Sequence, residues 1–313
     1  MGGYSRRDFL ARSAVGVSAL AGSSWLPAAA FGQEKPADMT IARWSGKEDL
    51  SAEELQNVAV QLTEKALAGV GGLGRFVGKG DVVWVKPNIG WDRKPELAAN
   101  CNPDLVATVV RLCFEAGAKA VKVGDNPCDI AAKTYVASGI AAAVRPLGAK
   151  VVFLDRSRFR EMAIDGERVK RLPIYPEIVE SDLVINIAIA KHHGLPGGTF
   201  CMKNYMGVME NRGSFHQAIA PCLADLTRFM KPKISILDAV RVLKAHGPKG
   251  GDPADVLLKT TVAAGVDIVA LDALGAELLG RKPSEIRSIV KGQEAGLGKM
   301  DYRSLALKEV AVS

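Results

Sequence analysis

Short apolar runs alternate along the chain with longer segments in which apolar residues recur every three or four positions. The clearest run covers residues 183–190. It is rich in β-branched residues and too short to span a membrane, so it predicts a buried strand of a parallel sheet. Residues 53–67 have apolar positions at helical spacing and predict a helix capped by Ser51. This alternation indicates an α/β domain with a mostly parallel sheet flanked by helices.

The other predicted elements follow the same two patterns. Apolar runs predict strands at residues 81–85, 120–124, 151–154, 234–237, 256–264 and 266–269. Helical spacing predicts helices at 102–116, 139–144 and 214–230, the last kinked or split by Pro221, and a helix containing Asp272. Residues 155–181 are interpreted as charged connections, and the C-terminal segment as one more helix followed by a polar tail.

The first thirty residues have the layout of an export signal. Arg6-Arg7 precede Phe9-Leu10, a weakly apolar stretch follows, and Ala28–Ala30 offer a cleavage site after Ala30. Residues 1–30 therefore predict a twin-arginine signal peptide. A short membrane anchor is the alternative, but glycines and serines dilute the apolar stretch, so a stable span is not expected. We interpret 31–45 as a linker and 46–313 as a single α/β domain, with a subdomain at 190–260 as an alternative.

The signal peptide predicts where the protein is located, and the charge balance indicates which partners it would bind. A twin-arginine signal implies recognition by the export machinery and a periplasmic or otherwise exported location. Because this route carries folded proteins, often with a cofactor bound, it favours a metal or redox cofactor. The net charge of +7 is a mild surplus, and aromatic residues make up only 6% of the chain. Since no concentrated basic face with stacking residues is visible, nucleic-acid binding is not expected.

Polar side chains follow four of the predicted strands at the point where each strand ends. The carboxyl ends of parallel strands share one edge of a sheet, and ligands bind there. We therefore expect these side chains, although far apart in sequence, to converge on one pocket. The four groups are Lys86 with Asn88, Asp125 with Asn126 and Cys128, Lys191-His192-His193, and Asp238 with the loop of His246.

Histidine and cysteine in these groups favour a metal site. Imidazole and thiolate are good ligands for transition metals, and the predicted ligands are His192, His193, His216, His246 and Cys128. A transition metal or iron–sulfur cluster is then the expected cofactor, with a redox role and a periplasmic electron-transfer partner. The chain has no C-x-x-C, so neither a ferredoxin-type run nor a zinc ribbon is claimed. Adjacent His192 and His193 should point to opposite sides.

The same residues also support chemistry without a metal. His193 or His216 would act as a general base and Lys191 would stabilise negative charge, on a small anionic substrate. A third alternative is a periplasmic binding or maturation protein without turnover. The absence of G-x-S-x-G, H-E-x-x-H and G-x-G-x-x-G at a βα turn argues against hydrolase, zincin and dinucleotide sites. The predicted ligand-binding residues are Lys86, Asn88, Asp125, Asn126, Lys203, Asn204, Arg212 and Asp238.

Longer motifs make the chain resemble domain-of-unknown-function family 362, in its twin-arginine-exported branch. The family has no settled activity, but some relatives carry ferredoxin-type cluster modules, which implies a redox function alongside them. This chain lacks such a module. Cys128 matches a cysteine of this branch, whereas Cys101 stands where Thr or a similar residue is expected and so is not an expected ligand. The motifs are residues 86–92, 102–104, 191–195, 203–208 and 211–213 with His216, 246–251, and Asp267 with Asp272.

Overall fold

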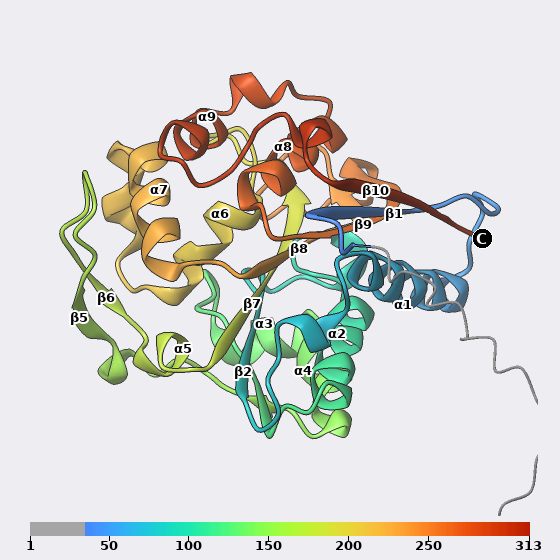
Figure 1. Ribbon diagram of the computed structural model, residues 1–313, viewed down its shortest axis with the longest axis horizontal. Coiled ribbons are helices and arrows are strands. Elements are labelled where there is room, and N and C mark those ends of the chain that lie inside the picture. Colours follow the sequence, from blue (N-terminus) through green and yellow to red (C-terminus); the bar gives the residue numbers. More distant parts are fainter. Residues whose placement is uncertain (1–34) are drawn as a thin grey trace, which may run out of the picture. The chain divides into compact units, whose positions relative to one another are not determined.

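An eight-stranded sheet runs through the computed structural model, which describes residues 35–313 (Figure 1). The predicted signal peptide, residues 1–30, lies outside these residues. The strand order is β10-β1-β9-β8-β7-β2-β3-β4. The strands are β1 (Met39–Trp44), β2 (Val82–Pro87), β3 (Ala120–Val123), β4 (Lys150–Val151), β7 (Leu183–Lys191), β8 (Ile234–Leu243), β9 (Val256–Gly265) and β10 (Leu307–Val312).

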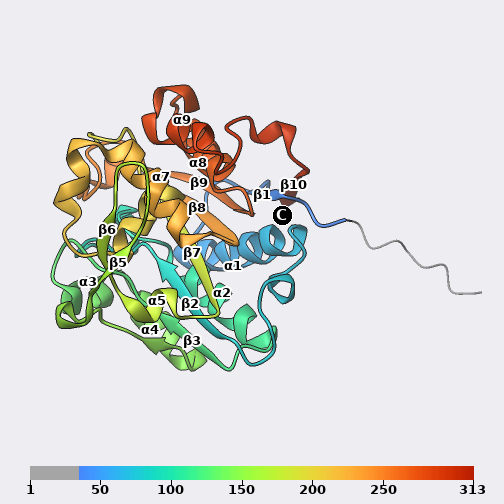
Figure 2. The same ribbon diagram turned by 60° about the vertical axis from the view of Figure 1, so that its left-hand side comes forward.

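Most neighbouring strands of this sheet are parallel. The pairs from β8 through β7, β2 and β3 to β4 are all parallel, as is β1 with β10, and only β9 runs antiparallel to its neighbours β1 and β8. The predicted α/β class with a mostly parallel sheet is thus confirmed. A separate hairpin, β5 (Arg160–Ala163) with β6 (Arg171–Ile174), stands beside the main sheet (Figures 1 and 2).

Helices cover both faces of the sheet (Figure 1). They are α1 (Ala52–Gly69), α2 (Pro103–Glu115), α3 (Ala131–Ala137), α4 (Ile140–Val144), α5 (Pro176–Val179), α6 (Cys201–Asn204), α7 (Ile219–Met230), α8 (Ile268–Leu278) and α9 (Arg287–Glu294). Short 3-10 helices lie at Leu73–Arg75, Pro95–Leu97, Arg145–Leu147, Arg156–Arg158, Tyr205–Val208, Arg212–Gln217, Pro253–Asp255, Pro283–Glu285 and Tyr302–Ser304.

Strand β7 shows how the pleat divides the core between the two faces. Ile185, Ile187 and Ile189 pack into the apolar cluster that α1 and α2 share, whereas Ala188 and Ala190 pack into the cluster of α7 and α8. Successive side chains of a strand point to opposite faces, so a strand covered on both sides must be apolar throughout. This is why residues 183–190 form a run that is apolar except for Asn186.

The structure corrects several predicted elements. Strand β1 lies inside the predicted linker 31–45, and the predicted polar tail forms β10, the edge strand beside β1. The predicted strand at 266–269 is wrong, because Asp267 accepts a hydrogen bond from the Ala270 backbone and starts α8 there. The predicted helix at 214–230 is split into a 3-10 turn and α7, with Pro221 in the first turn of α7.

Two further differences concern strand length. The predicted strand at 151–154 shrinks to the two residues of β4, and β8 runs well past its predicted end at residue 237. Residues 155–181, interpreted as connections, contain the hairpin of β5 and β6.

Residues Pro36–Ser313 form one compact unit. Within the described chain, no helix is both long and apolar enough to cross a membrane.

Candidate functional site

A pocket of about 230 Å³ lies where β2, β3 and β7 end at their carboxyl edge. This is the edge at which the sequence predicts a site. Side chains from all three strand ends line the pocket, together with residues of α6 and of the turn at Arg212–Gln217. The lining comprises Asn88, Gly90, Trp91, Asp125, Asn126, Cys128, Lys191, His193, Thr199, Lys203, Asn204, Met206, Gly207, Arg212, His216 and Pro248.

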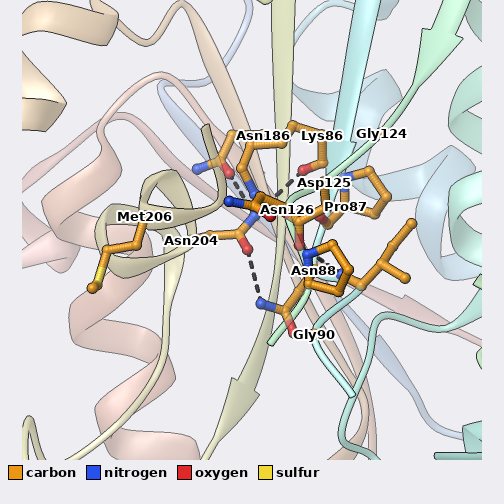
Figure 3. A network of polar contacts seen from close by, with 12 residues as sticks. Lys86, Pro87, Asn88, Gly90, Gly124, Asp125, Asn126, Asn186, Asn204 and Met206 are labelled. Atoms are coloured by element: carbon orange, nitrogen blue, oxygen red, sulfur yellow. Dashed lines mark hydrogen bonds and ion pairs between the residues drawn. The ribbon is translucent and has the colours of Figure 1, made fainter. Parts of the chain in front are cut away.

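An ion pair between β2 and the end of β3 forms the floor of the site (Figure 3). The Lys86 ammonium lies 2.8 Å from Asp125 Oδ1, and both side chains are buried. The other carboxylate oxygen of Asp125 accepts a hydrogen bond of 2.9 Å from the Ile89 backbone. Burial lowers the pKa of Lys86, and the negative charge of Asp125 opposes that shift. Asp125 is therefore neutralised within the protein.

Gly207 covers this ion pair closely. A Cβ atom at this position would lie 1.7 Å from Asp125 Oδ1 and 2.7 Å from Lys86 Nζ, both far inside van der Waals contact. The Gly207 carbonyl also accepts a hydrogen bond from the Asn126 backbone. Only glycine fits here, and this steric constraint explains the glycine in the motif of residues 203–208.

Three asparagines connect the strands to α6 (Figure 3). The Asn204 amide donates to Asn186 Oδ1 at 2.8 Å and to the Ile187 carbonyl at 2.9 Å, and its oxygen accepts from Asn88 at 3.0 Å. At the start of α6 the buried Asp272 carboxylate accepts from the Cys201 backbone at 2.6 Å. Burial raises the pKa of Asp272 to about 8. Asp272 thus positions the helix that carries Lys203 and Asn204.

Lys191 is a buried cation without a carboxylate partner. Its ammonium donates to Asn88 Oδ1 at 2.9 Å and to the Ala99 carbonyl at 2.5 Å. Burial lowers its pKa to about 7, and the nearby charge of Lys203 acts in the same direction. Neutral acceptors stabilise an ammonium less than a carboxylate does, so Lys191 can gain or lose a proton near neutral pH.

Two more cations line the same pocket. The Lys203 ammonium makes no hydrogen bond or ion pair within residues 35–313, and burial lowers its pKa to about 8. Arg212 donates to the backbone carbonyls of Met206 and Asn126 and, at 3.0 Å, to the sulfur of Cys128. Neither faces a carboxylate that would cancel its charge. The pocket therefore has an excess of positive charge.

The two pocket histidines differ in their surroundings. His193 Nδ1 lies 3.1 Å from the Thr199 hydroxyl, and burial, reinforced by Lys203 and Lys191, lowers the pKa of His193 to about 3. Its imidazole is therefore neutral at physiological pH. His216 is exposed at the pocket wall and makes no hydrogen bond within the part of the chain that the structure describes.

Four predicted site residues do not line the pocket, the first being Lys86, which is buried beneath it in the ion pair with Asp125. His192 points the other way, as its position beside His193 predicts, and its Nδ1 accepts from the Gly247 backbone at 3.1 Å. His246 is exposed and its Nδ1 lies 2.8 Å from Asp255. Asp238 is buried within β8, where it accepts from the Asn102 and Val240 backbones. Its role in the structure is to join β8 to the start of α2.

The predicted metal ligands are consequently not assembled into one set. His193, His216 and Cys128 lie around the pocket, but His192 and His246 do not. Across residues 35–313, no three His, Cys, Asp or Glu side chains lie close enough together to hold a metal ion. The side chains of these described residues therefore do not fit a metal centre or a cluster.

Several pocket residues have no counterpart among the predicted ones. Trp91, Thr199 and Pro248 line the cavity, and Asn186 holds Asn204 from within β7. The role of Asn186 could have been predicted from the sequence, since it is the single polar residue in the apolar run 183–190. A buried amide needs partners, and such a residue inside a central strand indicates a polar network.

Residues 83–277 match the family model described as "Domain of unknown function (DUF362)", which is more than half of the chain. The chain belongs to the DUF362 family. The resemblance that the motifs suggest is thereby confirmed at the level of the family, whereas the twin-arginine-exported branch stays a prediction. All the pocket-lining residues fall inside the matched DUF362 region.

One curated relative adds a broader likeness. A thylakoid-associated protein of Synechocystis sp. is 29% identical over 241 residues, which cover 74% of this chain and 73% of the relative. The similarity therefore extends over most of the DUF362 region and of the described domain.

Proposed function

We propose that the pocket binds a small anionic ligand, a carboxylate or phosphate, and that the protein is an enzyme acting on it by acid–base chemistry. One observation carries this proposal. Lys191, Lys203 and Arg212 line one cavity without a carboxylate partner, while the single pocket carboxylate, Asp125, is already neutralised by Lys86. Buried or half-buried cations of this kind require a counter-charge, and a ligand anion supplies it.

Lys203 and Arg212 hold the anion in this scheme. Both cations lie at the wall of the pocket. The neutral His193 adds a hydrogen-bonding group without adding a positive charge that would repel Lys203 and Arg212. A bound anion would raise the pKa of Lys203, because the anion adds an attractive charge beside a lysine that otherwise has only Arg212 as a charged neighbour of the same sign. Binding is therefore coupled to proton uptake near neutral pH.

Lys191 is the proposed base. In its neutral form the amine gives its two hydrogens to Asn88 Oδ1 and to the Ala99 carbonyl, which leaves the lone pair for the pocket. A pKa of about 7 places this group at the pH where an acid–base catalyst is most effective. The lone pair takes a proton from the ligand, and the resulting ammonium returns it in a later step.

Residues 35–313 offer no set of metal ligands that would support the expected metal-dependent redox role, so we do not propose that role. Export stays a prediction that rests on Arg6-Arg7, and the thylakoid association of the Synechocystis relative supports a place of action outside the cytoplasm.

Calorimetry with phosphate, sulfate, acetate and malonate tests the binding step. We expect Lys203→Met to weaken binding at least about tenfold, the loss of one charge-assisted contact. Lys65→Met is the matched control, because Lys65 is exposed on α1, away from the pocket. Affinity should fall as pH rises through about 8, where Lys203 loses its proton.

Proton exchange tests the catalytic step. In D2O, NMR should show exchange of the acidic C–H protons of malonate or pyruvate by the wild-type protein, and Lys191→Met should abolish it. Binding that does not depend on Lys203 or on pH would contradict the anion site. Exchange that persists in Lys191→Met would contradict the role of Lys191 as base.

A further inference from the structure

A second cavity, of about 480 Å³, adjoins the first at His216. His216 belongs to the lining of both cavities, so its side chain forms part of the wall between them. The second cavity lies between the loop after β7, the start of α7 and the start of α9, and α7 packs against α9 (Figure 1). Its lining comprises Gly194, Leu195, Pro196, Gly197, His216, Gln217, Ala218, Ile219, Ala220, Pro221, Arg281, Glu285, Arg287 and Ser288.

Ser288 presents a hydroxyl without a protein partner to this cavity. The residue is only 7% exposed and lines the cavity, and its hydroxyl makes no hydrogen bond within residues 35–313. The hydroxyl oxygen itself is not fully enclosed, so it opens onto the cavity, where a ligand oxygen can accept its hydrogen bond.

The charges around Ser288 favour an anion. Arg287 makes no ion pair or hydrogen bond in the described part of the chain, and Arg281 reaches Glu285 only at 3.4 Å. The first turn of α7 also faces the cavity, and no side chain caps it. The backbone N–H groups of Ile219 and Ala220 in this turn attract negative charge, whereas Pro221 has no N–H and the Cys222 N–H donates to the Ala218 carbonyl.

We propose that this second cavity is a subsite for a second anionic group of the same ligand. The ligand is then an extended molecule with two anionic ends, one at Lys203 and Arg212 and the other at Arg287 and Ser288, and it passes His216 between them. This inference rests on the proposed function of the first pocket and specifies its substrate class. A ligand spanning both cavities is also closer in size to the molecules that protein sites usually hold.

A ladder of ligand lengths tests the proposal. Calorimetry would compare linear dicarboxylates from malonate to sebacate with the monocarboxylates of the same chain length. Dicarboxylates too short to reach the second cavity should bind like their monocarboxylates. Beyond a threshold length, the dicarboxylate should bind at least about tenfold tighter, the effect of a charge-assisted contact. A parallel series of linear alkyl bisphosphates shows whether the second subsite prefers phosphate.

Variants then locate the second end. Arg287→Met and Ser288→Ala should each remove the gain of the long dicarboxylates, while Lys203→Met should weaken long and short ligands together. Lys282→Met is the matched control, since Lys282 is an exposed cation beside Arg281 that does not line the cavity.

The outcomes separate the two proposals. Binding that depends on Lys203 but shows no length threshold, or a threshold that survives Arg287→Met and Ser288→Ala, overturns the second subsite and leaves the first intact. If no carboxylate or phosphate binds, both proposals fail. If binding depends on Arg287 but not on Lys203, the two cavities do not share a ligand and the extended substrate is ruled out.

Discussion

Lys86 and Lys191 stand on the adjacent strands β2 and β7, and both are buried, but they differ in their partners. Lys86 faces the carboxylate of Asp125, whereas Lys191 faces an amide oxygen and a backbone carbonyl. A carboxylate fixes the charge of a buried lysine, while neutral acceptors leave it free to titrate. The first lysine therefore holds the strand ends together, and the second is available for chemistry.

The largest expected effect comes from breaking the Lys86–Asp125 pair. Asp125→Ala leaves the ammonium buried without a counter-charge, and we expect it to lower the free energy of unfolding by about 3–5 kcal/mol. Urea denaturation measures this. In the double variant Lys86→Met with Asp125→Leu, which buries no charge, most of the loss should be recovered. A loss below about 1 kcal/mol, as for an exposed pair, would remove the distinction between the two lysines.

The next effect is a pH dependence that belongs to Lys191. The pKa of Lys191 is about 7 in the folded protein against 10.5 for an ordinary lysine, so between these values the unfolded chain binds the extra proton. The free energy of unfolding should therefore rise with pH across this window, by about 1.4 kcal/mol per pH unit for this group. Denaturation curves of the wild type and of Lys191→Met should differ by this slope, and parallel curves would show that Lys191 titrates normally.

The smallest effect is expected at Lys249, a lysine near the pocket that is both paired and partly exposed. It lies 3.3 Å from Asp129 and 5.6 Å from the centre of the Trp91 ring, with 44% of its side chain exposed. Lys249→Met should change the free energy of unfolding by at most about 1 kcal/mol, because solvent screens both contacts. A thermal melt measures this change. A loss of stability as large as that of Asp125→Ala would mean that burial does not determine how much each lysine contributes to stability.

The sequence predicts the central sheet well and its edges poorly. The apolar run of β7 is unmistakable because helices cover both faces of that strand. Strand β10 has two adjacent charged residues, Lys308 and Glu309, and only Val312 is buried, since β10 has only β1 beside it; its sequence therefore resembles a tail. The run at 266–269 is apolar enough for a strand, but the capping bond of Asp267 decides for a helix, and only the structure shows that bond.

The same reasoning explains which site residues could be predicted. Lys86, Asp125, Lys191 and His193 meet because parallel strands end at one edge, which the residue pattern already implies. Asp238 fails as a pocket residue because β8 continues past it, and strand length is poorly marked when the following residues are also apolar. Thr199 could not be predicted, since its place depends on how the loop after β7 folds back onto Lys191.

The position of β1 in the sheet has a consequence for how the protein is made. β1 pairs on one side with β9 and on the other with β10, so both of its neighbours are translated at the far end of the domain. Among the strands of this sheet β1 is synthesised first, and it has neither of its sheet partners until β9 and β10 have been translated. Both edges of β1 stay unpaired until then, so this part of the sheet closes only after the last residues of β10 are made.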